Sequence, residues 1–257
     1  MKWIRGLLIL VLLTISCSSE MNKMNIAKKT TYRKNLDVKD ADAHRESETS
    51  YDRNGHVVKE VLFDPSGNVI RSVEYSYNGN RCVREIHRDG NGQQLLVKDL
   101  VYQNEKLSRI EVKGAQSVTI DYTYQDNGEY DEVTIIGGQH KYQKHWDSYG
   151  KLLWEVNLMD GNRTDYAYDD RGNLTEIKEE HGEGHTSLRY QNEYDSEGNC
   201  VKIFMNGTLT SEFVYNEGWV VKEIRYTPEG NPEVEMIYQY EFKLKDTESA
   251  KANGRDL

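Results

Sequence analysis

The chain has 257 residues, of which 30% are charged and 37% hydrophobic. It carries 33 Lys and Arg residues against 43 Asp and Glu residues, which gives a formal net charge of −10 at pH 7. Such an acidic chain repels nucleic acid, so DNA and RNA are excluded as partners. The mixture of both signs predicts a solvated surface, and a cationic partner is compatible with it.

The first residues have the pattern of an export signal. Lys2 and Arg5 precede the apolar run 6–15, which is too short to span a bilayer as a permanent helix. The letters LTISCSS that follow resemble a bacterial lipobox. That resemblance implies a signal peptide over 1–16, a lipid on Cys17 that binds the membrane, and an outer-membrane lipoprotein of a Gram-negative envelope, periplasmic or surface-exposed. The alternative is an ordinary signal, cleaved near Cys17 without a lipid.

Two segments lack apolar periodicity. Residues 17–50 contain the polar stretches NKMN, RKN and DAHRESE, and residues 246–257 are similarly polar. Such segments cannot bury enough apolar surface to offset their ordering entropy. We therefore expect a lipidated N-terminus with a flexible tether over 17–50 and a polar tail over 246–257.

The segment between them, residues 51–245, is repetitive. An aromatic residue, a polar turn with glycine and an apolar strand start recur, for example in YDRNGHV, FDPSGNV, WDSYGKL, YDSEGNCV and YTPEGNP. Turn glycines such as Gly55, Gly67 and Gly79 are twelve residues apart. Each repeat therefore predicts one strand and one hairpin turn, in which glycine supplies the positive φ that tight turns need.

The strands of these repeats show a period of two. Val118, Ile120, Tyr122 and Tyr124 fall on one face of an extended segment, with polar residues between them. Consecutive strands joined by short turns are antiparallel neighbours, and no helical period appears in this part of the sequence. We expect an all-β fold, an antiparallel meander of hairpins that forms a curled or spiral open sheet, or partial barrel, with exposed edge strands.

One copy of the repeat carries a family resemblance. The letters YAYDDRGNL, beginning at Tyr166, resemble the YD repeat of RHS and teneurin-type proteins, and the resemblance extends over roughly residues 51–242. In that family, arrays of such hairpins spiral into shells or form cell-surface adhesion modules. The resemblance therefore implies a β-spiral architecture and a role at the cell surface.

Aromatic side chains are the best candidates for ligand binding. Exposed Tyr and Trp residues can anchor a protein partner or stack on sugar rings, and they can equally be the packing residues of the repeat. The candidates are Trp146, Trp154, Tyr168, Tyr194, Tyr215 and Trp219. We expect a non-enzymatic binding module for a protein partner, with a glycan as the alternative ligand. Trp154 and Trp219 discriminate best, because they do not precede a turn.

Other chemistry has weaker support. The HGEGH segment offers His181, Glu183 and His185 as metal ligands, but its flanking glycines favour a turn. No nucleophile, P-loop or dinucleotide motif is present in the sequence, so we expect no cofactor and no enzyme, a metal-dependent hydrolase being the least supported alternative. Cys82 and Cys200 are either two small apolar residues or a disulfide.

Overall fold

A computed structural model describes residues 26–182 and 184–243. The predicted signal peptide, Cys17 and the tail at 246–257 lie outside these residues. Eighteen strands make up the described chain. They are β1 (Ile26–Asn35), β2 (His44–Tyr51), β3 (Val57–Phe63), β4 (Val69–Asn78), β5 (Arg81–Asp89), β6 (Gln94–Gln103), β7 (Lys106–Lys113), β8 (Val118–Tyr124), β9 (Tyr130–Ile136), β10 (Gln139–Trp146), β11 (Leu152–Asn157), β12 (Arg163–Tyr168), β13 (Leu174–His181), β14 (Gly184–Tyr194), β15 (Cys200–Met205), β16 (Thr208–Asn216), β17 (Trp219–Tyr226) and β18 (Pro232–Phe242).

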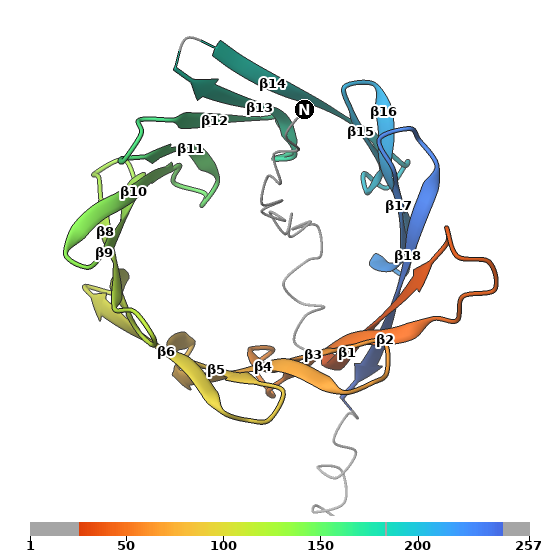
Figure 1. Cartoon of the computed structure of the whole chain (residues 1–257), viewed down its shortest axis with the longest axis horizontal. Coiled ribbons are helices and arrows are strands. Elements are labelled where there is room, and N and C mark those ends of the chain that lie inside the picture. Colours follow the sequence, from red (N-terminus) through yellow and green to blue (C-terminus); the bar gives the residue numbers. More distant parts are fainter. Residues whose placement is uncertain (1–25, 183, 244–257) are drawn as a thin grey trace, which may run out of the picture.

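The strands form a closed barrel. Each strand pairs antiparallel with the next along the chain, and β1 also pairs with β18 from Ile26 opposite Phe242 to Asn35 opposite Val234. Figure 1 shows the resulting ring, viewed down its axis. The prediction of an all-β antiparallel meander is confirmed, whereas the prediction of an open sheet with free edges is wrong, because β1 hydrogen-bonds both of its neighbours.

The barrel also begins earlier than predicted. Residues 26–35 and 44–51, expected to belong to a flexible tether, form β1 and β2. The sequence IAKKTTYRKN has no apolar alternation, but it contains β-branched and aromatic residues that favour strands. The strand that closes the barrel, β1, is stabilised by its two flanking strands. Its own apolar content therefore did not predict that it forms a strand.

A recurring Asp-x-x-Gly turn joins many of the strands. In the turn after β12, the Asp169 carboxylate accepts the backbone N–H groups of Arg171 at 3.0 Å and Asn173 at 2.8 Å. Gly172 has a φ of 87° and donates its N–H to the Asp169 carbonyl at 2.9 Å. The same bond from the fourth residue after the aspartate recurs in the turns at Asp52, Asp64, Asp89, Asp147 and Asp195. The turn chemistry predicted from the repeat is therefore present.

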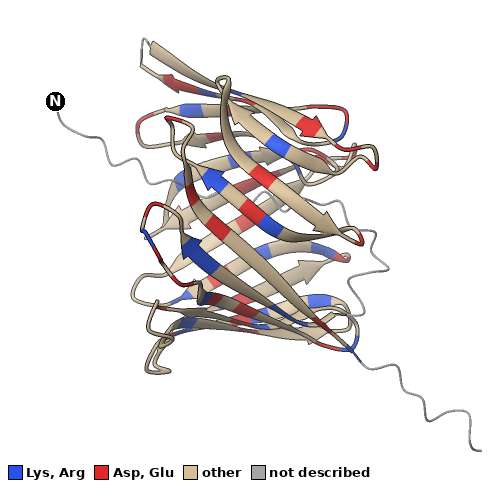
Figure 2. Cartoon of the chain, turned by 90° about the vertical axis from the view of Figure 1, so that its right-hand side faces the viewer, with Lys and Arg blue, Asp and Glu red and all other residues tan. Residues whose placement is uncertain are grey.

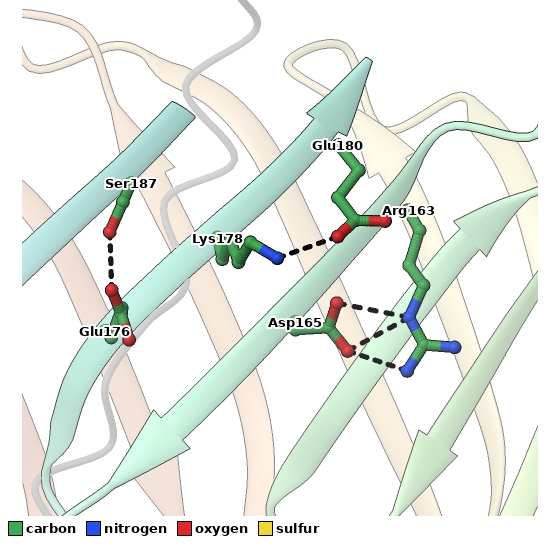
Figure 3. Close-up of polar contacts among 6 residues, drawn as sticks. All are labelled: Arg163, Asp165, Glu176, Lys178, Glu180 and Ser187. Atoms are coloured by element: carbon green, nitrogen blue, oxygen red, sulfur yellow. Dashed lines mark hydrogen bonds and ion pairs between the residues drawn. The ribbon is translucent and has the colours of Figure 1, made fainter. Parts of the chain in front are cut away.

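The outer face of the wall is charged. Figure 3 shows six polar residues on one face of β12 to β14, with the opposite wall of the barrel behind them. Arg163 contacts Asp165 at 2.7 Å, and Lys178 contacts Glu180 at 2.8 Å. When the strand register is followed around the barrel, the same face carries further ion pairs between neighbouring strands. They include Lys28–Glu48, Lys59–Glu74, Arg84–Asp99, Lys113–Asp99, Arg109–Asp121, Lys202–Glu212 and Lys222–Glu235. Basic and acidic positions are interspersed on the strands in Figure 2.

The opposite, inner face carries most of the tyrosines and most of the aliphatic residues. Val73 and Met236 on this face are buried at 8% and 3% exposure, yet no side chain of the described residues falls below 2%. Eighteen strands spaced ~4.8 Å apart and tilted by about 40° give a ring roughly 35 Å across between backbones. In a ring of this width, the inner side chains line the wall around the barrel axis and remain half-buried.

Candidate functional site: an aromatic girdle on the inner wall

One rim of the barrel carries an aromatic residue on each alternate strand. The even-numbered strands all end at the same rim, because consecutive strands are antiparallel. Each has an aromatic residue at its last, second-last or third-last position. These nine residues, called here the aromatic girdle, are Tyr51, Tyr77, Tyr102, Tyr124, Trp146, Tyr168, Tyr194, Tyr215 and Tyr240.

Backbone hydrogen bonds hold the girdle tyrosines against the wall. The Tyr168 hydroxyl donates to the carbonyl of Leu152, the first residue of the preceding strand, at 2.9 Å. The same bond, at 2.8 to 3.0 Å, links Tyr77 to Val57, Tyr102 to Cys82, Tyr215 to Cys200 and Tyr240 to Val220. Since each hydroxyl reaches sideways to a neighbouring strand, each ring lies along the wall and turns a face to the inside.

A second tier of tyrosines, two residues before the girdle, binds carboxylates. Tyr75 donates to Glu60 at 2.6 Å, Tyr166 to Glu155 at 2.6 Å and Tyr238 to Glu223 at 2.7 Å. Burial, together with the neighbouring carboxylates, raises the pKa of these second-tier hydroxyls far above its ordinary value of 10. They therefore stay protonated and remain donors at neutral pH.

Cations from the rim lie over several girdle faces. Lys106 Nζ is 4.7 Å from the centre of the Tyr124 ring, and the Arg171 guanidinium is 4.1 Å from that of Tyr194. Further pairs are Arg81 with Tyr102, Lys151 with Tyr168 and Lys29 with Tyr240, at 5.5 to 5.9 Å. Such contacts are attractive, since the face of an aromatic ring is electronegative. The girdle therefore accepts positive charge.

The largest aromatic cluster includes the girdle residues Tyr124 and Trp146 and lies on β8, β9 and β10. Tyr130 stacks on Trp146 with centroids 5.9 Å apart, and it also lies 5.1 Å from Tyr124 and 6.2 Å from Tyr122. The Trp146 Nε1 is buried and has no hydrogen-bond partner among the described residues. A buried donor without an acceptor costs about 1 to 3 kcal/mol.

Four of the predicted binding aromatics belong to the girdle, namely Trp146, Tyr168, Tyr194 and Tyr215. Trp219, at the start of β17, lies beside them with its ring 5.2 Å from that of Tyr240. Trp154 is on the outer face, where it stacks on His145 at 5.3 Å and on the Arg163 guanidinium at 4.6 Å. Trp154 and Trp219, the most discriminating of the predicted binding residues, therefore lie on opposite faces of the wall and form no common platform.

The structure does not place the described members of the predicted metal site, His181 and His185, in a common set of ligands. Glu183 lies outside the described residues, His181 Nε2 is 3.1 Å from Glu179, and His185 is opposite Glu180 in the register of β13 and β14. No group of three potential ligands exists in the described part of the chain.

The two described cysteines, Cys82 and Cys200, are free. Cys200 is buried, and desolvation raises the pKa of its thiol to about 11, so it is not a reactive thiolate.

Five girdle residues are absent from the set of predicted binding residues, namely Tyr51, Tyr77, Tyr102, Tyr124 and Tyr240. A signal for them exists, because an aromatic residue precedes every second turn of the repeat. That signal becomes a ring only when the sheet is known to close, so an open-sheet expectation concealed it.

The geometry defines a class of protein, a wide closed β-barrel with a charged outer wall and an aromatic inner rim. Among described residues, no helical segment has the length and apolar character needed to cross a membrane. No protein-family model and no curated protein matches the chain.

Two solved structures with similar folds are porin-like proteins from Bacteroides uniformis and Bacteroides vulgatus. The first has 8% identity and a TM-score of 0.40, and the second 12% and 0.35. In both comparisons the match covers 84% of this chain and 98% of the other. Similarity at this level does not indicate a function for the chain.

Proposed function

We propose that the chain is a non-enzymatic lipoprotein of the cell envelope whose barrel binds a segment of a partner protein against its inner wall. The observation that carries this proposal is the aromatic girdle, since rigid aromatic residues supply large contact areas at low entropic cost. The inner width of roughly 35 Å between backbones exceeds the 10 to 12 Å diameter of a helix with side chains, so an inserted segment fits.

The outer wall supports anchoring through a lipid on Cys17 instead of insertion of the barrel in a bilayer. A basic residue on the lipid-facing side of a membrane barrel costs about 2 to 4 kcal/mol at the midplane. The outer face here carries charged pairs across the middle of its strands, such as Arg84 with Asp99 at 2.6 Å and Arg109 with Asp121 at 2.6 Å. This wall is suited to water.

Site-specific photo-crosslinking in intact cells tests the proposal. A photoreactive phenylalanine analogue at Tyr215, in the girdle, is expected to capture the same protein reproducibly. The matched position is Trp154, on the outer face, where the same analogue is expected to capture nothing specific. Cells in which the Tyr215 position yields no protein adduct, or the same adducts as Trp154, would contradict the proposal.

A glycan is the second candidate ligand for the same girdle. It is favoured by the ring faces that the hydroxyl-to-carbonyl bonds turn towards the inside, because flat aromatic faces stack on apolar faces of a ligand. The test is a glycan array with wild type and with Trp219→Ala, with Trp154→Ala as the outer-face control. Binding lost only in Trp219→Ala supports this ligand, and an array without any binding removes it.

A further inference from the structure

Three glutamates of the inner wall each contact a lysine or arginine. Glu85 contacts Lys98 at 2.8 Å, Glu223 contacts Arg225 at 2.6 Å, and Glu155 contacts Lys144 at 3.6 Å. These pairs balance the charge on the inside locally. Glu60 and Glu132, on the same wall, have no such pair among the described residues and are the exceptions.

Glu132 on β9 is one of these exceptions. It has no ion pair within 4.0 Å among the described residues, since Lys144, which faces it in the register, lies closer to Glu155. Its carboxylate accepts a hydrogen bond from the Tyr122 hydroxyl. Burial raises its pKa above the ordinary value, in spite of Lys144. The charge of an ionised Glu132 is thus only partly compensated, by Lys144.

The surroundings of Glu132 are the largest aromatic cluster of the barrel. Tyr122 is two residues before the girdle on β8, and Tyr130 lies next to it towards the rim and stacks on Trp146. Here the described residues place no cation over the Tyr130 or Trp146 ring, in contrast with Tyr124, which has Lys106 at 4.7 Å.

We infer that the inner wall at β8 to β10 binds a lysine or arginine side chain of the inserted protein segment, between Glu132 and the rings of Tyr122 and Tyr130. A carboxylate combined with aromatic faces selects an organic cation, since the first supplies charge and the second a cation–π contact. A net charge of −10 attracts a basic segment to the barrel. This inference rests on the proposed function and names the chemistry of the partner.

The experiment is calorimetric titration of the full mature chain in non-ionic detergent. The probe is a capped nonapeptide of alanine, leucine and three lysines, and its counterpart has three glutamates in their place. Wild type is expected to bind the lysine peptide, and Glu132→Gln is expected to weaken binding about tenfold, since the charge-assisted contact is lost. A cooperative unfolding transition with a midpoint no lower than that of wild type establishes that each variant is folded.

Glu60→Gln is the matched control. Glu60 is also on the inner wall, has a tyrosine partner in Tyr75 and has no ion pair within the described residues, but it lies outside the Trp146 cluster. Its affinity for the lysine peptide is expected to stay within twofold of wild type. The inference is overturned if Glu132→Gln binds like wild type, if both variants lose affinity equally, or if the glutamate peptide binds as well. A partner captured at Tyr215 together with any of these results leaves the proposed function standing and removes only this inference.

Discussion

At the scale of the residue, the hydroxyls of the girdle tyrosines contribute to structure, and their rings are the proposed binding surface. Tyr168→Phe removes only the hydroxyl that donates to the Leu152 carbonyl at 2.9 Å. It is expected to lower the free energy of unfolding by about 1 kcal/mol, the usual net contribution of one such bond. Urea unfolding measures this loss. Tyr149→Phe, at a side chain that is 86% exposed, is the control and is expected to change stability by less than about 0.5 kcal/mol. Equal stability of both variants would show that the bond contributes nothing.

A second prediction concerns Glu132 and pH. Burial raises the pKa of this carboxyl above its ordinary value of 4.5, so its ionised form destabilises the folded state at neutral pH. Glu132→Gln is therefore expected to raise the thermal midpoint at pH 7. The gain decreases as the pH falls through the raised pKa, and it is lost below the ordinary value, where glutamic acid is neutral in both states. A gain that grows with acidity would contradict this reasoning.

At this scale, the sequence predicted which residues form the strands and turns better than it predicted which face of the wall they occupy. The alternation of Val118, Ile120 and Tyr122 correctly predicts one face of β8, and the turn glycines have the predicted positive φ. Which face lies inside could not be predicted, because both faces carry charge. Glu132 and Glu155, for instance, are polar residues on the inner wall, where tyrosine hydroxyls stabilise them.

At the scale of the element, the hairpin is the unit that sequence predicts well, and ring closure is what it misses. Short turns and strand alternation are local, so they can be read from neighbouring residues. The pairing of β1 with β18 joins the two ends of the described chain, and neither strand contains a signal that names the other. The polar composition of β1 therefore concealed the closed architecture.

Closure makes a specific prediction about circular permutation. Ile26 and Phe242 are opposite each other in the register, so a short Gly/Ser linker can join the ends of the barrel. New ends placed between Gly137 and Gly138, in the turn after β9, leave every strand pair intact. The permutant is expected to unfold cooperatively with a β-type far-ultraviolet spectrum. The control, opened between Glu85 and Ile86 in the middle of β5, is expected to fail. Two permutants that behave alike would contradict the closed ring.

At the scale of the whole molecule, the charged outer wall predicts how the protein partitions. A chain beginning at Ser18, which lacks Cys17, is expected to remain in the supernatant after centrifugation with vesicles and without detergent. The chain processed in cells is expected to sediment with the vesicles, because acyl chains on one terminus bind a membrane firmly. Vesicle binding by the chain that begins at Ser18 would instead place the wall itself in the bilayer.

The position of the chain ends has a consequence for access to the barrel. β1 starts and β18 finishes at the rim that carries the aromatic girdle. Eight residues separate Cys17 from Ile26, and the distance between these two residues is at most about 30 Å when the chain is fully extended. With the proposed lipid in place, the girdled opening is tethered near the headgroups and the far opening is free to face the surrounding fluid. A bulky globular partner is therefore admitted most easily from the far opening, whereas a thin, extended or membrane-attached one can also enter beside the anchor.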